Sequence, residues 1–334
     1  MRIYFIGPLR STFVRNDIAI LEREHELQKF DAEFGAGMAG LKPFLRLSVR
    51  TLRAVLRSRA VFCWFADYTT LFPALVARLL RKPVYVVAGG FDSRWLPQLN
   101  YGAKAKPHRW FCIRNTFRLA TRIFAVSQAT ADSLDELTEG RHGPIQVLYN
   151  GVNLSRLHAA MSAPAPQRDI VLTVSQASIP LEMHIKGIDR FVKLAEQVPE
   201  QQFVVAGLRG PALELIQWAA EPLENVRVIP GPLDLETELI PLYRRATAYC
   251  QLSRDETFGV AVVEAMACGC APIVTSAGGL PEVVGDSAAP VDADEDIIAA
   301  MRAAADVRDR SVYRLQAQRF DISHRAADLL TALG

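Results

Sequence analysis

One stretch decides the fold of this chain: Glu256-Thr-Phe-Gly-Val-Ala-Val-Val-Glu264-Ala-Met-Ala-Cys-Gly269-Cys-Ala-Pro272. Two carboxylates lie eight residues apart, with a Phe-Gly turn and an apolar, alanine-rich run between and after them. The run over 260–267 has helical composition, Gly269 suits a helix C-cap, and Pro272 opens a short buried strand. The stretch therefore predicts a loop, a helix and a strand, with Glu256 before the helix and Glu264 inside it.

The start of this expected helix is a candidate anion site. The backbone N–H groups of Phe258, Gly259 and Val260 are donors at the positive end of a helix. Carboxylates that accept sugar hydroxyls beside such a phosphate site suggest a nucleotide-sugar. The alternative is a solvated loop acid and a helix-surface acid. We prefer the first interpretation because Glu264 is surrounded in sequence by apolar residues, where an unpaired carboxylate is costly.

Strands alternate with helices on both sides of this stretch, which predicts parallel sheets built from βα units. Two such series occur, and the proline-containing residues 163–167 are the best linker candidate between them. We therefore expect domains at residues 1–162 and 163–314. Within the first, residues 13–30 have helical spacing, and a glycine-rich loop or a weak strand end is expected over 34–41.

Composition limits the class of protein. The chain has 334 residues, of which 50% are hydrophobic and 22% charged, as in a soluble protein with two cores. Its five cysteines lack the spacing of a disulfide framework or of a metal site, so we expect no metal and a reducing cytoplasm. No run of 18 apolar residues predicts a membrane span.

Charge is divided unevenly along the chain. Residues 1–150 contain 22 Lys and Arg against 12 Asp and Glu, whereas the remainder contains 16 against 24. The helix expected from Lys42 to Arg59 concentrates this basic charge, with cations three or four residues apart. Its alternatives are an amphipathic helix packed on its own sheet with a charged outer face, and a helix docked on an anionic bilayer.

The expected strand ends of the second domain carry further candidate residues. Ligands of doubly wound sheets bind beyond the carboxyl ends of the strands. Gln176, Gly207 and Arg209 follow two such strands. Lys186 precedes another helix, where it suits a diphosphate, although a surface lysine beside a turn glycine is the alternative.

These motifs together resemble the donor-site signature of glycosyltransferase family four, whose members are retaining enzymes of the GT-B fold. The resemblance is firm over about residues 123–285, and it rests on the two glutamates at their spacing, the turn and helix between them, and Lys186. It implies two Rossmann-like domains that face each other across a cleft. It also implies that the last segment, residues 315–334, returns to complete the first domain.

The resemblance implies a role for each candidate. Glu264 would accept the ribose hydroxyls, and Glu256 would hold the donor sugar near the reacting carbon. The amides of residues 258–260 would bind sugar or phosphate, and Lys186 would neutralise the leaving diphosphate without a metal or cofactor. The family usually has an arginine shortly before this lysine. Gln176 lies in that region here, and Arg209 is either a substitute or an exposed side chain.

The acceptor side departs from the commoner family pattern. Many members carry a histidine near the reaction centre, where this chain has Gly89-Gly-Phe-Asp92. Asp92 is therefore a candidate catalytic residue, with a helix cap as its alternative.

The sequence as a whole predicts transfer of a sugar, with retention, from a nucleotide diphosphate-sugar to a glycan, lipid-linked or small-molecule acceptor. We expect a cytoplasmic protein, with a peripheral place on the inner face of the plasma membrane as a further option, and no nucleic-acid partner. A nucleotide-sugar epimerase or hydrolase of the same fold is the main alternative. A dinucleotide oxidoreductase is disfavoured because no Gly-x-Gly-x-x-Gly follows the first strand. A non-catalytic binding module is disfavoured by the presence of both glutamates and the lysine.

Overall fold

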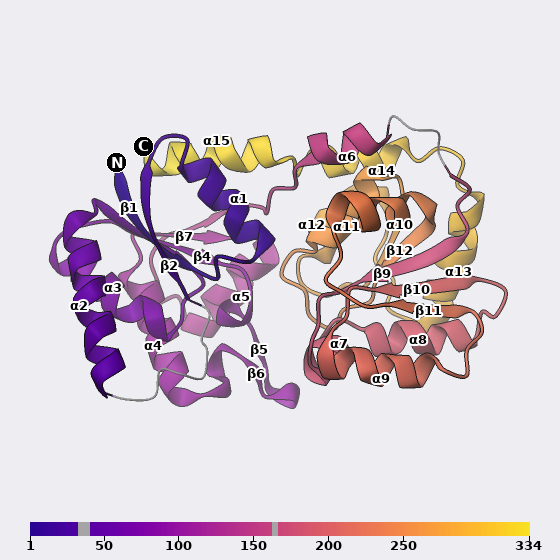
Figure 1. Cartoon of the computed structure of the whole chain (residues 1–334), viewed down its shortest axis with the longest axis horizontal. Helices are drawn as coiled ribbons and strands as arrows, with labels where there is room; N and C mark the ends of the chain where they lie inside the picture. Colours follow the sequence, from indigo (N-terminus) through magenta and orange to yellow (C-terminus); the bar gives the residue numbers. More distant parts are fainter. Residues whose placement is uncertain (33–40, 162–165) are drawn as a thin grey trace. The chain divides into compact units, whose positions relative to one another are not determined.

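The computed structural model describes residues 1–32, 41–161 and 166–334, with side chains from 49 to 157 in the middle range (Figure 1). They form two compact units. Unit 1 comprises Met1–Gly151 and Arg325–Gly334, and unit 2 comprises Val152–His324. The expected glycine-rich loop, apart from residue 41, and residues 163–165 of the expected linker lie outside the described part of the chain.

Unit 1 contains a six-stranded parallel sheet in the order β2-β1-β3-β4-β7-β8. Its inner strands are short runs of β-branched and aromatic residues that are buried on both faces, as parallel strands covered by helices must be. Their bounds are β1 (Arg2–Gly7), β2 (Glu26–Asp31), β3 (Ala60–Trp64), β4 (Val84–Ala88), β7 (Arg122–Ala125) and β8 (Ile145–Val147).

One face of this sheet packs against four helices, α2, α3, α4 and α5, in a single apolar core. The helices of unit 1 are α1 (Thr12–Leu21), α2 (Leu41–Arg57), α3 (Tyr68–Leu79), α4 (Pro107–Leu119), α5 (Gln128–Thr138) and most of α15 (Ile322–Leu333). A short antiparallel hairpin, β5 (Trp95–Leu96) with β6 (Tyr101–Gly102), and three 3₁₀ turns, η1 (Phe91–Ser93), η2 (Pro97–Leu99) and η3 (Ala103–Ala105), lie between β4 and α4.

The helix expected over residues 13–30 is wrong in its second half. Helix α1 ends at Leu21, and β2 then pairs with β1 from Arg2↔Glu26 to Gly7↔Asp31. The apolar residues Leu27 and Phe30 lie three residues apart, as on one side of a helix, and this interval favoured a continued helix. Backbone pairing at the edge of the sheet overrides that spacing, because strand preference depends on tertiary context.

The C-terminal helix α15 is attached to unit 1 by a buried ion pair. Arg325 donates to both carboxylate oxygens of Asp17, at 2.6 and 2.7 Å, and also to the carbonyl oxygens of Leu148 and Tyr149. Trp64 Nε1 donates to the same carboxylate at 2.8 Å. Burial without such partners would be costly for either charge, so this network fixes where the last helix packs.

Unit 2 contains a five-stranded parallel sheet in the order β11-β10-β9-β12-β13. This is doubly wound topology, and the strand order reverses between β9 and β12, where ligands of such sheets bind. The strands are β9 (Ile170–Val174), β10 (Gln202–Ala206), β11 (Val226–Ile229), β12 (Ala246–Gln251) and β13 (Ala271–Val274).

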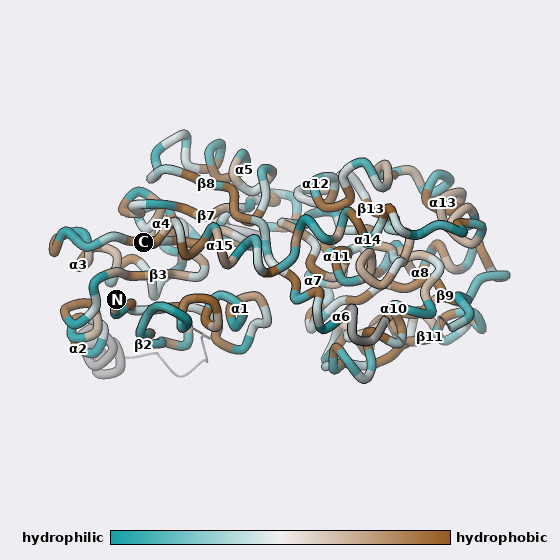
Figure 2. Tube along the Cα trace, turned by 90° about the horizontal axis from the view of Figure 1, so that it is seen from above, coloured by the Kyte–Doolittle hydropathy of each residue, from teal (hydrophilic) through white to brown (hydrophobic). Residues whose placement is uncertain are grey.

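Helices cover the sheet of unit 2, and hydrophobic stretches of the trace alternate with hydrophilic ones in both units (Figure 2). The helices are α6 (Leu154–Met161), α7 (Pro180–Ile185), α8 (Ile188–Glu196), α9 (Gly210–Ala220), the π-helical turn η4 (Leu235–Leu239), α10 (Ile240–Arg245), α11 (Val260–Ala267), α12 (Leu280–Val284), η5 (Gly285–Ser287), α13 (Asp294–Asp306) and α14 (Ser311–Gln318).

Candidate functional site

The loop after β12 brings the first predicted carboxylate to the switch point of unit 2. Glu256 lies five residues beyond the end of β12, and its side chain is almost fully buried. Helix α11 then begins at Val260, as the sequence predicted. Its N-cap is Gly259, at φ 102°, and no side chain caps the helix. A Cβ at this glycine would come within 2.9 Å of Leu280 Cδ2, so the turn requires glycine.

Lys186 reaches this buried carboxylate across 70 residues of sequence. Its Nζ lies 2.9 Å from Oε1 and 2.8 Å from Oε2 of Glu256. The lysine side chain is about one-third exposed and the glutamate side chain less than one-tenth. The Lys186 ammonium group therefore contacts a buried carboxylate, and part of the lysine side chain is accessible to a ligand. This contact favours the functional interpretation of Lys186 over that of an unattached surface lysine.

The turn that carries Lys186 is pressed against the end of β12. Gly187 has φ 70°, and a Cβ there would lie 1.8 Å from the carbonyl oxygen of Leu252. Arg254 N–H donates to the carbonyl of Ile185 at 2.7 Å. Only glycine permits this close approach, so the sequence pair Lys186-Gly187 is explained by backbone contact as well as by the charge.

A second ion-pair network braces the same two segments. Arg254 donates to both oxygens of Asp189, and His184 Nδ1 lies 2.8 Å from Asp189 Oδ2. Burial acts to raise the pKa of Asp189, but Arg254 and His184 outweigh it, and the pKa lies below its ordinary value. The carboxylate is therefore ionised at neutral pH and joins the start of α8 to the loop after β12.

Two polar residues hold Glu256 from the other side, and Gln251 is the one that the sequence reasoning missed. Gln251 Nε2 and Ser253 Oγ both donate to Glu256 Oε2, each at 3.3 Å. Tyr249 Oη in turn donates to Gln251 Oε1 at 2.9 Å. These three residues alternate along the end of β12 and are buried. A run of alternating polar residues at the end of a buried strand was the available signal.

Glu264 projects from the middle of α11. Tyr243 Oη donates to its Oε2 at 3.0 Å, and Arg156 adds a more distant positive charge. Burial nevertheless raises the pKa of Glu264 to about 7. The carboxyl group is therefore close to half ionised at neutral pH. Tyr243 was also missed, because a tyrosine within an apolar helix reads as core.

The remaining donor-site candidates differ in exposure. Phe258 is buried, with its ring 5.3 Å from that of Phe320, and Val260 is partly exposed. Gly207 has φ 97° and lies against the carbonyl of Ser175. The side chains of Gln176 and Arg209 are exposed. The N–H of Arg209 bonds to the carbonyl of Ala177 at 3.1 Å, so the two loops that carry them meet through the backbone.

Asp92 lies in unit 1, where its carboxylate is fully buried. It accepts hydrogen bonds from the backbone N–H groups of Ala66, at 3.0 Å, and Gly90, at 3.2 Å. Burial raises the pKa of Asp92 to about 7 against the opposing effect of these amides. The carboxyl group thus joins the turns that follow β3 and β4. Its predicted catalytic role stays a prediction.

Other features of the described residues bear on the sequence predictions. All five cysteines are free thiols. Within residues 1–32, 41–161 and 166–334, no cluster of three or more His, Cys, Asp or Glu side chains has the arrangement of a metal site. Among the same residues, no helix combines the length and the apolar character needed to cross a bilayer.

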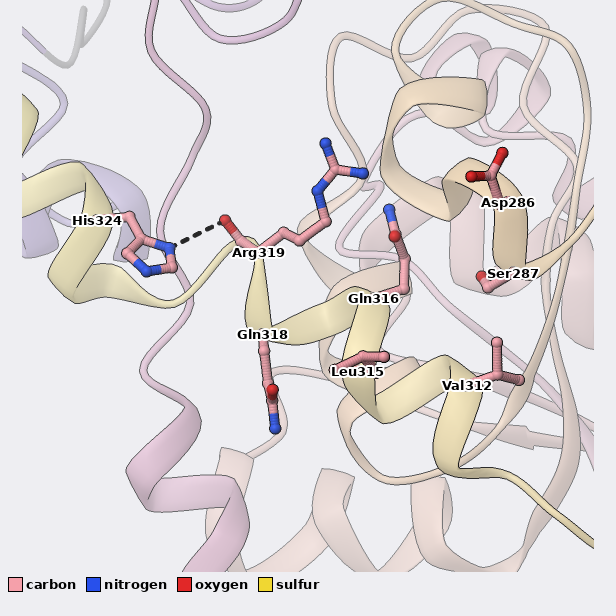
Figure 3. A pocket seen from close by; sticks show the side chains of 8 residues that line it. All are labelled: Asp286, Ser287, Val312, Leu315, Gln316, Gln318, Arg319 and His324. Carbon is pink, nitrogen blue, oxygen red and sulfur yellow. Dashed lines mark hydrogen bonds between the residues drawn. The ribbon is translucent and has the colours of Figure 1, made fainter.

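A shallow groove elsewhere in unit 2 contains none of the predicted site residues. It runs between η5 and α14, and Figure 3 shows Leu315 and Val312 beside the polar side chains of Gln316 and Arg319. His324 Nδ1 lies 3.2 Å from the carbonyl oxygen of Arg319 (Figure 3). We assign no ligand to this groove.

Two family models match the chain, one on each side of the linker. The model described as glycosyl transferases group 1 matches residues 165–309, which include Lys186, Glu256 and Glu264. The model described as glycosyltransferase family 4 matches residues 13–156. The chain belongs to glycosyltransferase family 4.

Curated relatives match only part of the chain. A D-inositol 3-phosphate glycosyltransferase of Mycobacterium sp. (strain JLS) is 28% identical over 181 residues, which cover 50% of this chain and 40% of that protein. The protein of that name from Mycobacterium tuberculosis (strain H37Ra) is 30% identical over 157 residues, 42% of this chain and 31% of its own length. The match thus spans less than half of these relatives.

Solved structures match the whole chain at low identity. Anabaena HepE in complex with UDP has a TM-score of 0.75 at 16% identity and covers 100% of this chain and 99% of that one. Sucrose-phosphate synthase from Thermosynechococcus elongatus has a TM-score of 0.73 at 17% identity and covers 100% and 98%. The family 4 chain therefore has the GT-B fold that the sequence predicted.

Proposed function

We propose that this chain is a retaining glycosyltransferase that moves a sugar from a nucleotide diphosphate-sugar to a hydroxyl of a glycan, lipid-linked or small-molecule acceptor. Bacterial polysaccharide or glycolipid assembly is the proposed setting. The observation that carries the proposal is the pair formed by Lys186 and Glu256 at the switch point of unit 2. It presents one partly exposed cation and one buried carboxylate where a doubly wound sheet binds its ligand.

The pair suits the two charges of a bound donor. Lys186 would turn from Glu256 toward the diphosphate, and the released Glu256 oxygens would accept hydroxyls of the donor sugar. Gln251 and Ser253 keep their bonds to Glu256 during this exchange, so the buried carboxylate is never without partners. The amides at residues 258–260 add donors for sugar or phosphate.

The proposed reaction proceeds on one face of the sugar. The bond between the anomeric carbon and the phosphate oxygen breaks, and a bond to the acceptor oxygen forms on the same side. The departing phosphate takes the proton of the acceptor hydroxyl. Lys186 stabilises the charge that develops on that phosphate, so the proposal requires no metal and no cofactor.

Glu264 would bind the ribose of the nucleotide. Its carboxylate, already held by Tyr243, can accept hydroxyl donors on its other oxygen. UDP is the nucleotide in the complexes with Anabaena HepE, one of which also contains glucose. We therefore propose UDP-glucose as the first donor to test.

A location in the cytoplasm, peripheral at the inner face of the plasma membrane through the segment from Lys42 to Arg59, belongs to the same proposal. The support is the exposure of Arg50, Arg53 and Arg57 on α2. No nucleic-acid partner is proposed.

Replacement of Glu264 tests the proposed function. Glu264→Ala should abolish UDP binding and sugar transfer while leaving the thermal unfolding curve cooperative. Glu214→Ala, at an exposed glutamate of α9, is the matched control and should keep both activities. Full transfer by Glu264→Ala would overturn the proposal. Product analysis with UDP-glucose alone separates transfer from epimerisation or hydrolysis, which consume donor without an acceptor.

A further inference from the structure

Two neighbouring helices of unit 1 leave large apolar side chains in solvent. On α2 these are Val49, Leu52 and Leu56, the last 53% exposed. On α3 they are Phe72, Leu75 and Leu79, the last 75% exposed, and Leu80 follows directly. Each set of three recurs at intervals of three and four residues, which places it on one side of its helix.

One of the two sequence alternatives for α2 is a helix that packs on its own sheet and has a charged outer face. The exposed apolar residues of α2 differ from that packing. Val55 is buried as expected, but the helix contacts the core mainly through small residues such as Thr51 and Ala54. Val49, Leu52 and Leu56 would be buried if the whole apolar side of the helix packed on its own sheet, and instead they lie in solvent. Helix α2 therefore carries apolar side chains on two sides, one packed against the core and one in solvent.

The two exposed stripes belong to one surface. Helices α2 and α3 are in contact, and both lie at the same end of unit 1 in the two views (Figures 1 and 2). Ala54 and Val55 of α2 share a core with Ala74 and Ala77 of α3 against the same side of the sheet. Both exposed sides therefore point away from that sheet. We call this surface the α2–α3 face and define it by Val49, Leu52, Leu56, Phe72, Leu75, Leu79 and Leu80.

A lysine fixes the spacing of the two helices. Lys82, shortly after α3, donates from Nζ to the carbonyl oxygens of Val55, Leu56 and Ser58 at 2.8, 2.9 and 2.6 Å. These are carbonyls at the end of α2, which a cation satisfies well. The α2–α3 face is thus preformed.

Positive charge surrounds the α2–α3 face. Arg50, Arg53 and Arg57 are exposed on α2, and Arg78 and Arg81 are exposed at the end of α3. Residues 34–91 include nine Lys and Arg but a single acid, Asp67. That acid is bound by Arg109 through both oxygens, so it does not offset the arginines around the face.

This combination selects one kind of occupant. A second copy of the chain on a twofold axis would bring the same arginines together, which opposes self-association. An anionic bilayer offers phosphate groups to the arginines and an acyl boundary to the leucines and phenylalanine. We infer that the α2–α3 face docks on a bilayer of anionic phospholipid, with its apolar side chains inserted at the headgroup level. The inference rests on the proposed peripheral location and extends it from the basic charges of α2 to an apolar surface on two helices.

Vesicle sedimentation of the full chain tests the inference. Wild-type protein should sediment with vesicles of equal parts phosphatidylglycerol and phosphatidylcholine, less with phosphatidylcholine alone, and less again as salt is raised. The double variant Leu56→Gln with Leu79→Gln should bind the anionic vesicles at least ten-fold more weakly. Arg53→Gln should weaken binding about five-fold, the effect of one surface cation.

Leu315→Gln is the matched control, because Leu315 is also a solvent-exposed leucine on a helix, α14, but in unit 2. It should bind vesicles as wild type does. The inference is overturned if wild type does not sediment with anionic vesicles, or if the control loses as much binding as the double variant. It is also overturned if wild type is a dimer in solution that the double variant dissociates. UDP binding, measured without vesicles on the same proteins, stays unchanged if only docking is affected, so failure here is separable from failure of the proposed function.

Discussion

At the residue scale, the candidate donor site depends on charged side chains that share hydrogen-bond partners. Lys186 lies on both oxygens of Glu256, while Gln251 and Ser253 hold one of them. The two charged residues and Glu264 could be found from sequence, because their spacing carries a family signature. Gln251 had only the alternation of polar residues at the end of β12 as a signal, and Tyr243 had none. Both residues act by bonding another side chain, and that contact exists only once the chain is folded.

Loss of the lysine charge should lower the rate of transfer more than it weakens donor binding. Lys186→Met removes the cation that stabilises the leaving diphosphate, so kcat should fall about 10²- to 10³-fold. Lys186→Arg should retain part of the rate. Lys193→Met, at an exposed lysine of α8, is the control and should leave steady-state kinetics with UDP-glucose unaltered. A change confined to KM would contradict the role in leaving-group stabilisation.

UDP binding should depend on the ionisation of Glu264. Burial raises the pKa of this group to about 7, so at pH 6 most of it is protonated, and the uncharged group is a weaker acceptor for the ribose hydroxyls. The dissociation constant for UDP should therefore rise about ten-fold between pH 8 and pH 6, following the ionised fraction. Calorimetric titration measures it. In Glu264→Gln the contribution of this group to the pH dependence of UDP binding should vanish. If the dissociation constant of that variant depends on pH as the wild type does, another group titrates.

The same pKa shift has the opposite consequence for folding. Because the pKa of Glu264 is raised above that of the unfolded chain, the folded protein holds more protons between about pH 4.5 and 7. Its contribution to stability is therefore full at low pH and falls as the pH rises through this interval. Strong donor binding and maximal stability thus favour opposite protonation states of one carboxyl group.

At the element scale, the parallel strands and most helices followed from apolar runs and their spacing. The motif helix α11 begins at Val260 as predicted, because its glycine turn and alanine-rich run agree locally. Strand β2 was missed because an edge strand obtains its stability from backbone pairing with β1, which leaves little trace in side-chain pattern. For α2 the sequence left two alternatives open, since apolar spacing alone does not say which surface a residue meets.

The turns after β3 and β4 depend on Asp92. Phe65 has φ 66°, a conformation that costs a non-glycine residue about 1–2 kcal/mol, and the next N–H, of Ala66, bonds to Asp92. Asp92→Asn can accept only one of the two backbone bonds, so it should lower the free energy of unfolding by about 1–3 kcal/mol. Urea denaturation measures this loss, with Asp132→Asn on the surface of α5 as control. Unchanged stability together with lost transfer would instead favour the catalytic role of Asp92.

At the scale of the whole molecule, the chain leaves unit 1 at Gly151 and returns to it at Arg325. The family resemblance implied that the C-terminal segment returns to the first domain, but it did not indicate which residues hold that segment there. Asp17 and Arg325 are 308 residues apart in sequence, and each by itself reads as an ordinary charged residue on an amphipathic helix. Only the fold shows that they meet in a buried pair beside Trp64.

Removal of one partner of this pair should destabilise unit 1 strongly. Arg325→Met leaves the buried Asp17 carboxylate without its counter-charge, which should cost about 3–5 kcal/mol. Asp17→Asn should cost less, because the amide still accepts from Trp64 or Arg325. Three of the four tryptophans of the chain, Trp64 among them, lie in unit 1, so their fluorescence during urea denaturation reports mainly on that unit.

The double variant distinguishes a coupled pair from two independent contributions. With Asp17→Leu and Arg325→Met combined, no charge of the pair is left buried, so the loss should be clearly smaller than the sum of the losses of Asp17→Leu alone and Arg325→Met alone. Arg302→Met, in an exposed ion pair with Glu200, is the control and should cost less than about 1 kcal/mol. Additive losses would mean that Arg325 stabilises unit 1 mainly through the carbonyls of Leu148 and Tyr149. In either case, truncation before Arg325 should leave unit 1 less stable than the full chain, because the truncated protein loses every one of these bonds at once.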